Sequence, residues 1–83
     1  MDTLTYNRIK EVIARKAKTS RLVADHLKVR EETVSSWCSN RNQPSIQTLF
    51  KLAKFLGVEA TDLLVSLKDL EKIHKKKIGH SKK

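Results

Sequence analysis

The sequence predicts an all-α domain. Two glycines and one proline interrupt its 83 residues, so the residues that form the tight turns between strands are scarce. No segment alternates apolar and polar residues, whereas several segments repeat apolar residues every three or four positions, which is the period of an amphipathic helix. A chain of this length forms one domain.

The first helix is predicted from about Tyr6 to Lys16, with Thr5 as its N-cap. Its apolar residues share one face: Tyr6, Ile9, Val12 and Ile13. The second helix is predicted from Ser20 to Leu27, with Thr19 as its N-cap. Its inward residues are Val23, Ala24 and Leu27, with Leu22 buried in part.

The third helix is predicted from about Glu31 to Ser39, with Val34 and Trp37 pointing inward. Asn40 follows it, and asparagine tolerates the left-handed conformation that ends helices. Because Trp37 lies at inward spacing from Val34, we expect its indole to pack in the core rather than to stack on a base.

A fourth helix is predicted after Pro44, with Ser45 as its N-cap and Gly57 at its end. Its buried face comprises Ile46, Leu49, Phe50, Leu52, Ala53 and Leu56. A short fifth helix, from about Ala60 to Ser66, carries Leu63 and Leu64.

Leucines continue at heptad-like spacing beyond residue 66, so the fifth helix extends to about His74 or another helix follows it. They are Leu63, Leu67 and Leu70, continued by Ile73 or His74. We therefore divide the chain into a domain at 1–66 and a C-terminal extension at 67–83, amphipathic to about 74 and then basic. Residues 75–83 are predicted to be disordered without a partner.

The net charge of +9 favours a polyanionic partner. Twelve basic and nine acidic residues lie in 1–71, whereas 72–83 holds six lysines and no acidic residue, so most of the excess charge is in the tail. Charge alone fits a membrane surface or a nucleic acid equally well. The tail either follows the DNA backbone as a basic arm, which we favour, or only keeps the chain soluble.

Several classes of protein are excluded. Cys38 is the only cysteine, so neither an internal disulfide nor a cysteine-based zinc site is expected. His26, His74 and His80 are too scattered for a metal site, and no nucleophile–base pair or glycine-rich phosphate loop is present. We expect a protein without enzymatic activity or cofactor, located in a reducing cytoplasm on the nucleoid, with no signal peptide or membrane span.

Two short helices joined by a tight turn usually place the second helix in the major groove of DNA. The segments SRLVADHLKVREETVSSW and NRNQPSIQTLFKLAKFLGV resemble the Xre/Cro/phage-repressor family of helix-turn-helix proteins over residues 6–65. TLTYNRIKEVIARK followed by WCSNRNQPS is similar to small members from Bacteroidetes. The resemblance implies a five-helix lambda-repressor-like domain with its motif at about 20–39.

Two positions depart from the family pattern. Lys28 occupies the turn position that is usually glycine, so the turn is wider or the strain is offset elsewhere. Ile13 and Cys38 occupy the positions of an arginine–glutamate ion pair that many members carry. Because both charges are absent together, we expect Cys38 to pack against Ile13 as a small apolar residue.

The resemblance implies that the start of the third helix contacts base edges through Glu31, Glu32, Thr33 and Ser36. It implies phosphate contacts from Ser20, Ser39, Asn40, Arg41 and Asn42, and Arg21 and Arg30 flank the same surface. Glutamate can accept a hydrogen bond from cytosine N4. The alternative is that Glu31 and Glu32 only complement the positive end of the helix dipole, and that Arg41 is a solvated loop residue.

We therefore expect a bacterial transcriptional regulator that binds double-stranded DNA sequence-specifically, as a two-fold dimer on a palindromic operator. The resemblance implies dimer contacts from Ala60, Leu63, Leu67 and Leu70. The alternative is a protein-interaction module, such as an antitoxin or an accessory subunit, whose C-terminal segment binds a partner protein.

Overall fold

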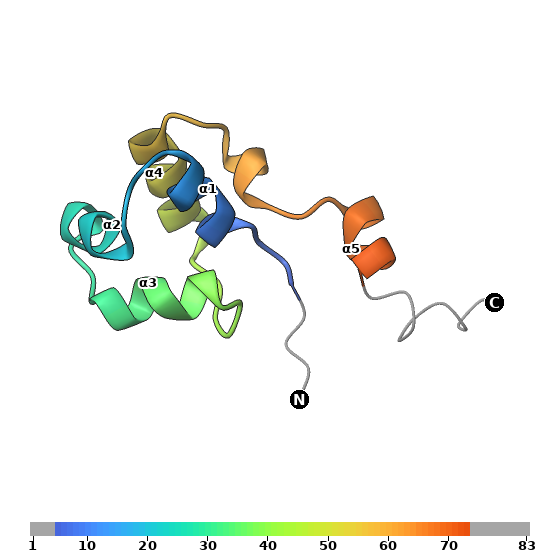
Figure 1. Ribbon diagram of the computed structural model, residues 1–83, viewed down its shortest axis with the longest axis horizontal. Coiled ribbons are helices and arrows are strands. Elements are labelled where there is room, and N and C mark those ends of the chain that lie inside the picture. The colour runs from blue at the N-terminus through green and yellow to red at the C-terminus, as the bar shows by residue number, and fades with distance from the viewer. Residues whose placement is uncertain (1–4, 74–83) are drawn as a thin grey trace.

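The computed structural model describes residues 5–73. These residues form helices and no strand, which confirms the all-α prediction (Figure 1). The elements in chain order are α1 (Ile9–Arg15), α2 (Ser20–Leu27), α3 (Glu31–Cys38), α4 (Ile46–Leu56), the single 3-10 turn η1 (Ala60–Leu63) and α5 (Leu67–Ile73). Figure 1 shows α1 to α4 and η1 gathered around one centre, with α5 set to one side.

Two helices begin where the sequence predicts a cap. The Thr19 hydroxyl accepts the N–H of Leu22 at 3.1 Å at the start of α2. The Ser45 hydroxyl accepts the N–H of Thr48 at 3.1 Å at the start of α4. Each bond satisfies a backbone donor that has no partner inside its helix.

The first four helices end in the same way. Each is followed by a residue with positive φ, and the next N–H donates to the carbonyl five residues before it, which is the Schellman arrangement. The positive-φ residues are Ala17, Lys28, Asn40 and Gly57, with φ between 57° and 72°. The turn at Lys28 is therefore not widened, and a side chain occupies a conformation that favours glycine.

The first helix begins later than the sequence predicts. α1 begins at Ile9 rather than at Tyr6, because residues 6–8 pair with the segment after η1. Arg8 donates its N–H to the Leu63 carbonyl, and Val65 donates to the Tyr6 carbonyl, both at 2.9 Å. Thr5 is consequently not the N-cap; the Asn7 side chain accepts the Ile9 N–H at 2.9 Å.

The predicted fifth helix is divided into two elements. η1 ends at Leu63, because Leu64 is extended and the segment 63–65 pairs with residues 6–8. The separate α5 begins at Leu67, and an ion pair of 3.2 Å between Arg8 and Asp69 joins it to the N-terminal segment. His74 and the basic tail at 75–83 lie outside the described residues.

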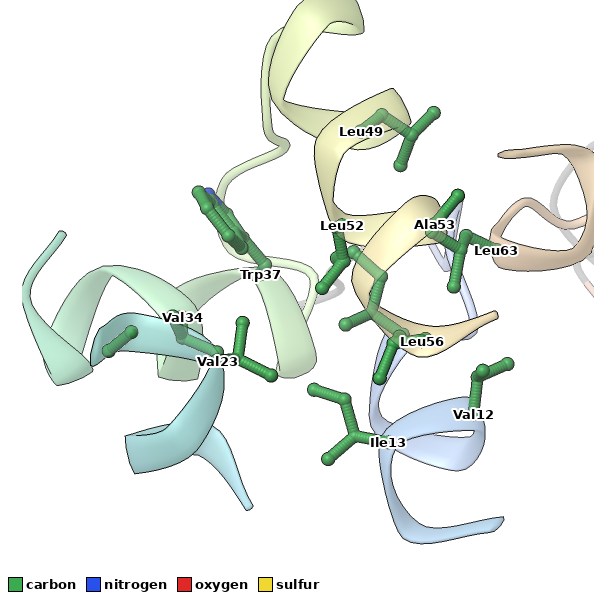
Figure 2. Packing of buried hydrophobic residues seen from close by; sticks show 12 residues of the cluster. Val12, Ile13, Val23, Val34, Trp37, Leu49, Leu52, Ala53, Leu56 and Leu63 are labelled. Carbon is green, nitrogen blue, oxygen red and sulfur yellow. The ribbon is translucent and has the colours of Figure 1, made fainter. Parts of the chain in front are cut away.

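The core joins α1, α2, α3, α4 and η1, and it contains most of the predicted apolar residues (Figure 2). It comprises Ile9, Val12, Ile13, Val23, Ala24, Val34, Trp37, Leu49, Leu52, Ala53, Leu56 and Leu63. Three predicted core residues are instead exposed, namely Tyr6, Ile46 and Phe50. Ile46 and Phe50 lie one turn apart on α4 and are 69% and 61% exposed, so this stripe of α4 faces solvent.

Cys38 is half-buried against the core cluster that includes Ile13. This placement agrees with the predicted role of a small apolar side chain, and direct contact with Ile13 stays a prediction. The Cys38 Sγ lies 3.9 Å from the Ser20 Oγ, which links the end of α3 to the start of α2.

Candidate nucleic-acid interface

α3 has an anchored face and an exposed face. Val34 and Trp37 are at most 5% exposed and fix the helix to the core. Glu31, Glu32 and Ser35 are exposed. The first two lie in the first turn, where carboxylates stabilise the positive end of the helix dipole. The outer face of α3 is therefore available to a large ligand.

Ser36 is buried, contrary to its predicted role as a base contact. The loop after α3 folds back on it, because the N–H groups of Arg41 and Asn42 donate to its carbonyl at 2.9 and 3.2 Å. Its side chain is buried, and its hydroxyl donates to the Thr33 carbonyl at 2.7 Å. Ser36 cannot reach a base edge in this position, whereas Thr33 remains partly exposed.

Asn40 connects this loop to the N-terminal segment. Its Oδ1 accepts the N–H groups of Tyr6 and Asn7, each at 2.9 Å, and its Nδ2 donates to the Asn7 carbonyl at 3.2 Å. Gln43 also donates to Oδ1, at 3.3 Å. The Asn40 side chain thus has a structural role, and its phosphate contact stays a prediction.

Asn7 completes the connection from inside the protein. Its side chain is 2% exposed and donates to the Trp37 carbonyl at 3.0 Å and to the Gln43 side chain at 2.7 Å. Asn7 and Asn40 together fix the loop that carries Arg41. Asn7 was not predicted, because it lies between Tyr6 and Arg8 and no local pattern marks it as buried.

Two hollows meet on the outer side of α3, and both are lined by Ser35 and Arg41. Glu31 and Glu32 complete the first hollow. The second brings together the start of α2 and the end of α3, and its remaining lining residues are Lys10, Ser20, Cys38 and Ser39. The structure thus gathers three predicted phosphate contacts, namely Ser20, Ser39 and Arg41.

Lys10 and Ser35 were not predicted as contacts. Ser35 lies one helical turn after Glu31, so the same helical spacing that selected Val34 and Trp37 as inward residues could have found it. Lys10 reaches the second hollow from α1, and only the tertiary packing of α1 beside α3 places it there.

Burial raises the pKa of the Cys38 thiol above its ordinary value, and this effect outweighs the hydrogen bond to Ser20 and the charge of Lys10, which both lower it. A raised pKa keeps the thiol protonated at neutral pH. Cys38 therefore contributes a neutral, packed side chain to the floor of this surface.

A helix-turn-helix family model matches residues 9–63, which is more than half of the chain. The chain belongs to the Cro/C1-type helix-turn-helix family. A protein from Bacteroides fragilis, solved as a "putative DNA-binding protein", is 44% identical, with a TM-score of 0.70 over 71% of this chain and 95% of that chain. Comparison with curated proteins found no match.

The other predicted contacts of this helix-turn-helix protein are spread more widely. Arg21, Arg30 and Asn42 are exposed but line neither hollow. Among the predicted dimer residues, Leu63 is 0% exposed in a single chain and offers no surface to a second one. The predicted dimer contact of Leu63 is therefore wrong. Leu67 is 71% exposed, and Ala60 and Leu70 are half-buried.

Within residues 5–73 of this helix-turn-helix protein, no group of histidine, cysteine, aspartate or glutamate side chains is arranged to hold a metal ion. In the same part of the chain, no helix has the length and apolar character needed to cross a membrane.

Proposed function

We propose that this protein is a transcriptional regulator that binds double-stranded DNA sequence-specifically, with α3 in the major groove. The observation that carries the proposal is the two-sided character of α3. Val34 and Trp37 hold it to the core, while its exposed side lines hollows that also contain Arg41 and the start of α2. Recognition in the major groove requires a rigid helix with a polar outer face, flanked by groups that donate hydrogen bonds to the DNA phosphates.

Base contacts are assigned to Glu31, Glu32, Thr33 and Ser35. A glutamate can accept a hydrogen bond from cytosine N4, and a hydroxyl can contact several bases. The competing explanation is that the glutamates only stabilise the start of α3. Glu32→Ala distinguishes the two: a shift of preference at one base pair supports base contact, whereas a uniform gain in affinity for all DNA means that Glu32 only repels the backbone.

Phosphate contacts are assigned first to Ser20, Ser39, Arg41 and Lys10, which line one hollow. The N–H groups at the start of α2 add donors suited to an anion, and the guanidinium of Arg41 can bind a phosphate through two hydrogen bonds. Arg21, Arg30 and Asn42 extend this assignment along the exposed surface. These contacts set the position of α3 on the duplex without selecting a sequence.

A dimer follows from the limited reach of one recognition helix, which covers only a few base pairs. A two-fold dimer places two copies of α3 in successive major grooves, about 34 Å apart, on a palindromic operator. Leu67 supplies the exposed apolar surface, and the half-buried Ala60 and Leu70 are the other proposed contacts. The basic residues at 75–83 supplement affinity without adding specificity.

Selection from a random pool of duplexes tests the proposal, followed by affinity measurement on the selected sequence. Recovery of a common motif supports a regulator. If the protein selects no sequence and is monomeric, the exposed Leu67 on α5 favours the second candidate function, a protein-interaction module that binds a partner through its C-terminal segment.

A further inference from the structure

A separate concave surface lies between the end of α2 and α4, with a volume of about 640 Å³. It shares no lining residue with the two hollows beside α3, and we call it the α2–α4 pocket. Its lining residues are His26, Leu27, Lys28, Lys51, Lys54 and Phe55. A ligand in this pocket therefore leaves the outer face of α3 free.

One wall of the pocket is aromatic and apolar. The rings of His26 and Phe55 stack with their centroids 4.2 Å apart and their planes inclined by 20°, and Leu27 and Phe55 are half-buried. The Lys18 ammonium lies 5.2 Å from the centroid of Phe55, within the range of a cation–π contact. The pocket thus offers an ordered apolar surface next to positive charge.

The other side of the pocket is cationic and uncompensated. Lys28, Lys51 and Lys54 are exposed, and none of them forms an ion pair within residues 5–73, where the ion pairs involve Arg8 and Arg15. No carboxylate lines the pocket. Three lysines and no carboxylate give the pocket a positive charge, which attracts an anionic ligand.

The backbone at Lys28 is left-handed, as it is at Ala17 and Asn40 after two other helices. Lys28 has φ of 60°, a conformation that costs a non-glycine residue about 1–2 kcal/mol. Glycine would avoid this cost, yet the turn carries a lysine at the edge of the pocket.

We propose that the α2–α4 pocket binds an acidic segment of a partner protein, with carboxylates on Lys28, Lys51 and Lys54 and an apolar side chain against Leu27 and Phe55. A combination of apolar wall and charged rim is typical of protein interfaces. A second DNA duplex would use the lysines but not the wall, because its sugar–phosphate backbone presents charged oxygens outward and no apolar side chain. The proposal does not depend on DNA binding, since the pocket and the α3 face have no residue in common.

The test is a titration of the isotopically labelled full-length chain, followed by NMR, with an acetylated and amidated peptide of six glutamates around two leucines. We expect amide shifts at residues 26–28 and 51–55 and none at 31–41. Replacing both leucines by serines should weaken binding at least threefold. The triple variant K28Q/K51Q/K54Q should weaken it at least tenfold, whereas K16Q/K68Q/K72Q, which removes the same charge outside the pocket, should stay within twofold.

Three results would overturn the proposal. One is equal weakening by the two triple variants, which indicates general charge attraction. Another is the absence of peptide-induced shifts at 26–28 and 51–55. The third is a 20-base-pair duplex that shifts these residues more strongly than the peptide does, which assigns the pocket to a second duplex. Loss of sequence-selective DNA binding in the same chain would affect only the proposed function, because the peptide titration contains no DNA.

Discussion

Asn7→Ala tests whether a buried polar residue holds the loop after α3 in place. The Asn7 side chain is 2% exposed, and its amide makes three hydrogen bonds. Its Oδ1 accepts the first N–H of α1, as the side chain of an N-cap residue does. Loss of an N-cap side chain costs about 1 kcal/mol. Its Nδ2 donates to the buried Trp37 carbonyl, and a net hydrogen bond of this kind contributes about 1 kcal/mol.

The third bond, to the Gln43 side chain, contributes close to nothing, because Gln43 is exposed and water can replace Asn7 as its partner. The sum is a loss of about 2 kcal/mol in the free energy of unfolding. For a domain of this size the melting temperature should fall by about 8–16 °C.

Urea unfolding followed by the fluorescence of Trp37, the only tryptophan, measures this change. Trp37 is 5% exposed, so its emission should respond strongly to unfolding. The matched control is Asn42→Ala, which truncates an exposed asparagine of the same loop and should change stability by less than about 0.5 kcal/mol. Equal effects of the two variants would refute the role given to Asn7.

Three further predictions concern the turn, the phosphate contacts and the dimer. Lys28→Gly should raise the free energy of unfolding by about 0.5–1 kcal/mol, because relief of the left-handed strain exceeds the added freedom of the unfolded chain; a calorimetric decrease in stability would contradict this. Arg41→Ala should reduce the slope of log affinity against log salt by about one, whereas Asn42→Ala should leave that slope unchanged because asparagine is neutral and displaces no counterion; an unchanged slope in both would exclude a phosphate contact at Arg41. Leu67→Glu should convert dimers to monomers in analytical ultracentrifugation, with Lys68→Glu as the control; a Leu67→Glu protein that stays dimeric would place the interface elsewhere.

Local rules predicted much of the fold. The caps at Thr19 and Ser45 depend on hydroxyls at fixed offsets from an apolar run, and both are present. Helical spacing correctly placed Val34 and Trp37 in the core. These features depend on neighbours within one or two turns, which a sequence displays directly.

Errors arose where distant segments pair. Tyr6 lies outside α1 because its carbonyl accepts the N–H of Val65, 59 positions later in the chain. The same pairing ends η1 at Leu63. Leu63 is buried there, so it cannot form the predicted dimer contact. Phe50 was predicted to be buried from its apolar character, but no described element covers that side of α4.

Only part of the candidate site could be predicted, again because some of its contacts join segments that are distant in the sequence. Glu31, Glu32 and Arg41 do line one hollow, and their place follows from the motif. The predicted base contact of Ser36 was wrong because the loop folds back onto the Ser36 carbonyl. Helical spacing does not describe hydrogen bonds between a helix and a loop. Lys10 was missed because α1 reaches the surface only through tertiary packing.

The most direct test of the central claim is selection of binding sites by the full-length protein from a pool of random duplexes. We expect enrichment of one two-fold symmetric motif, with half-site centres about ten base pairs apart. In a parallel selection, the Glu32→Ala protein should change the preference at one position in each half-site. A pool that stays random after repeated rounds, at salt concentrations where the protein binds DNA, would contradict sequence-specific recognition by α3.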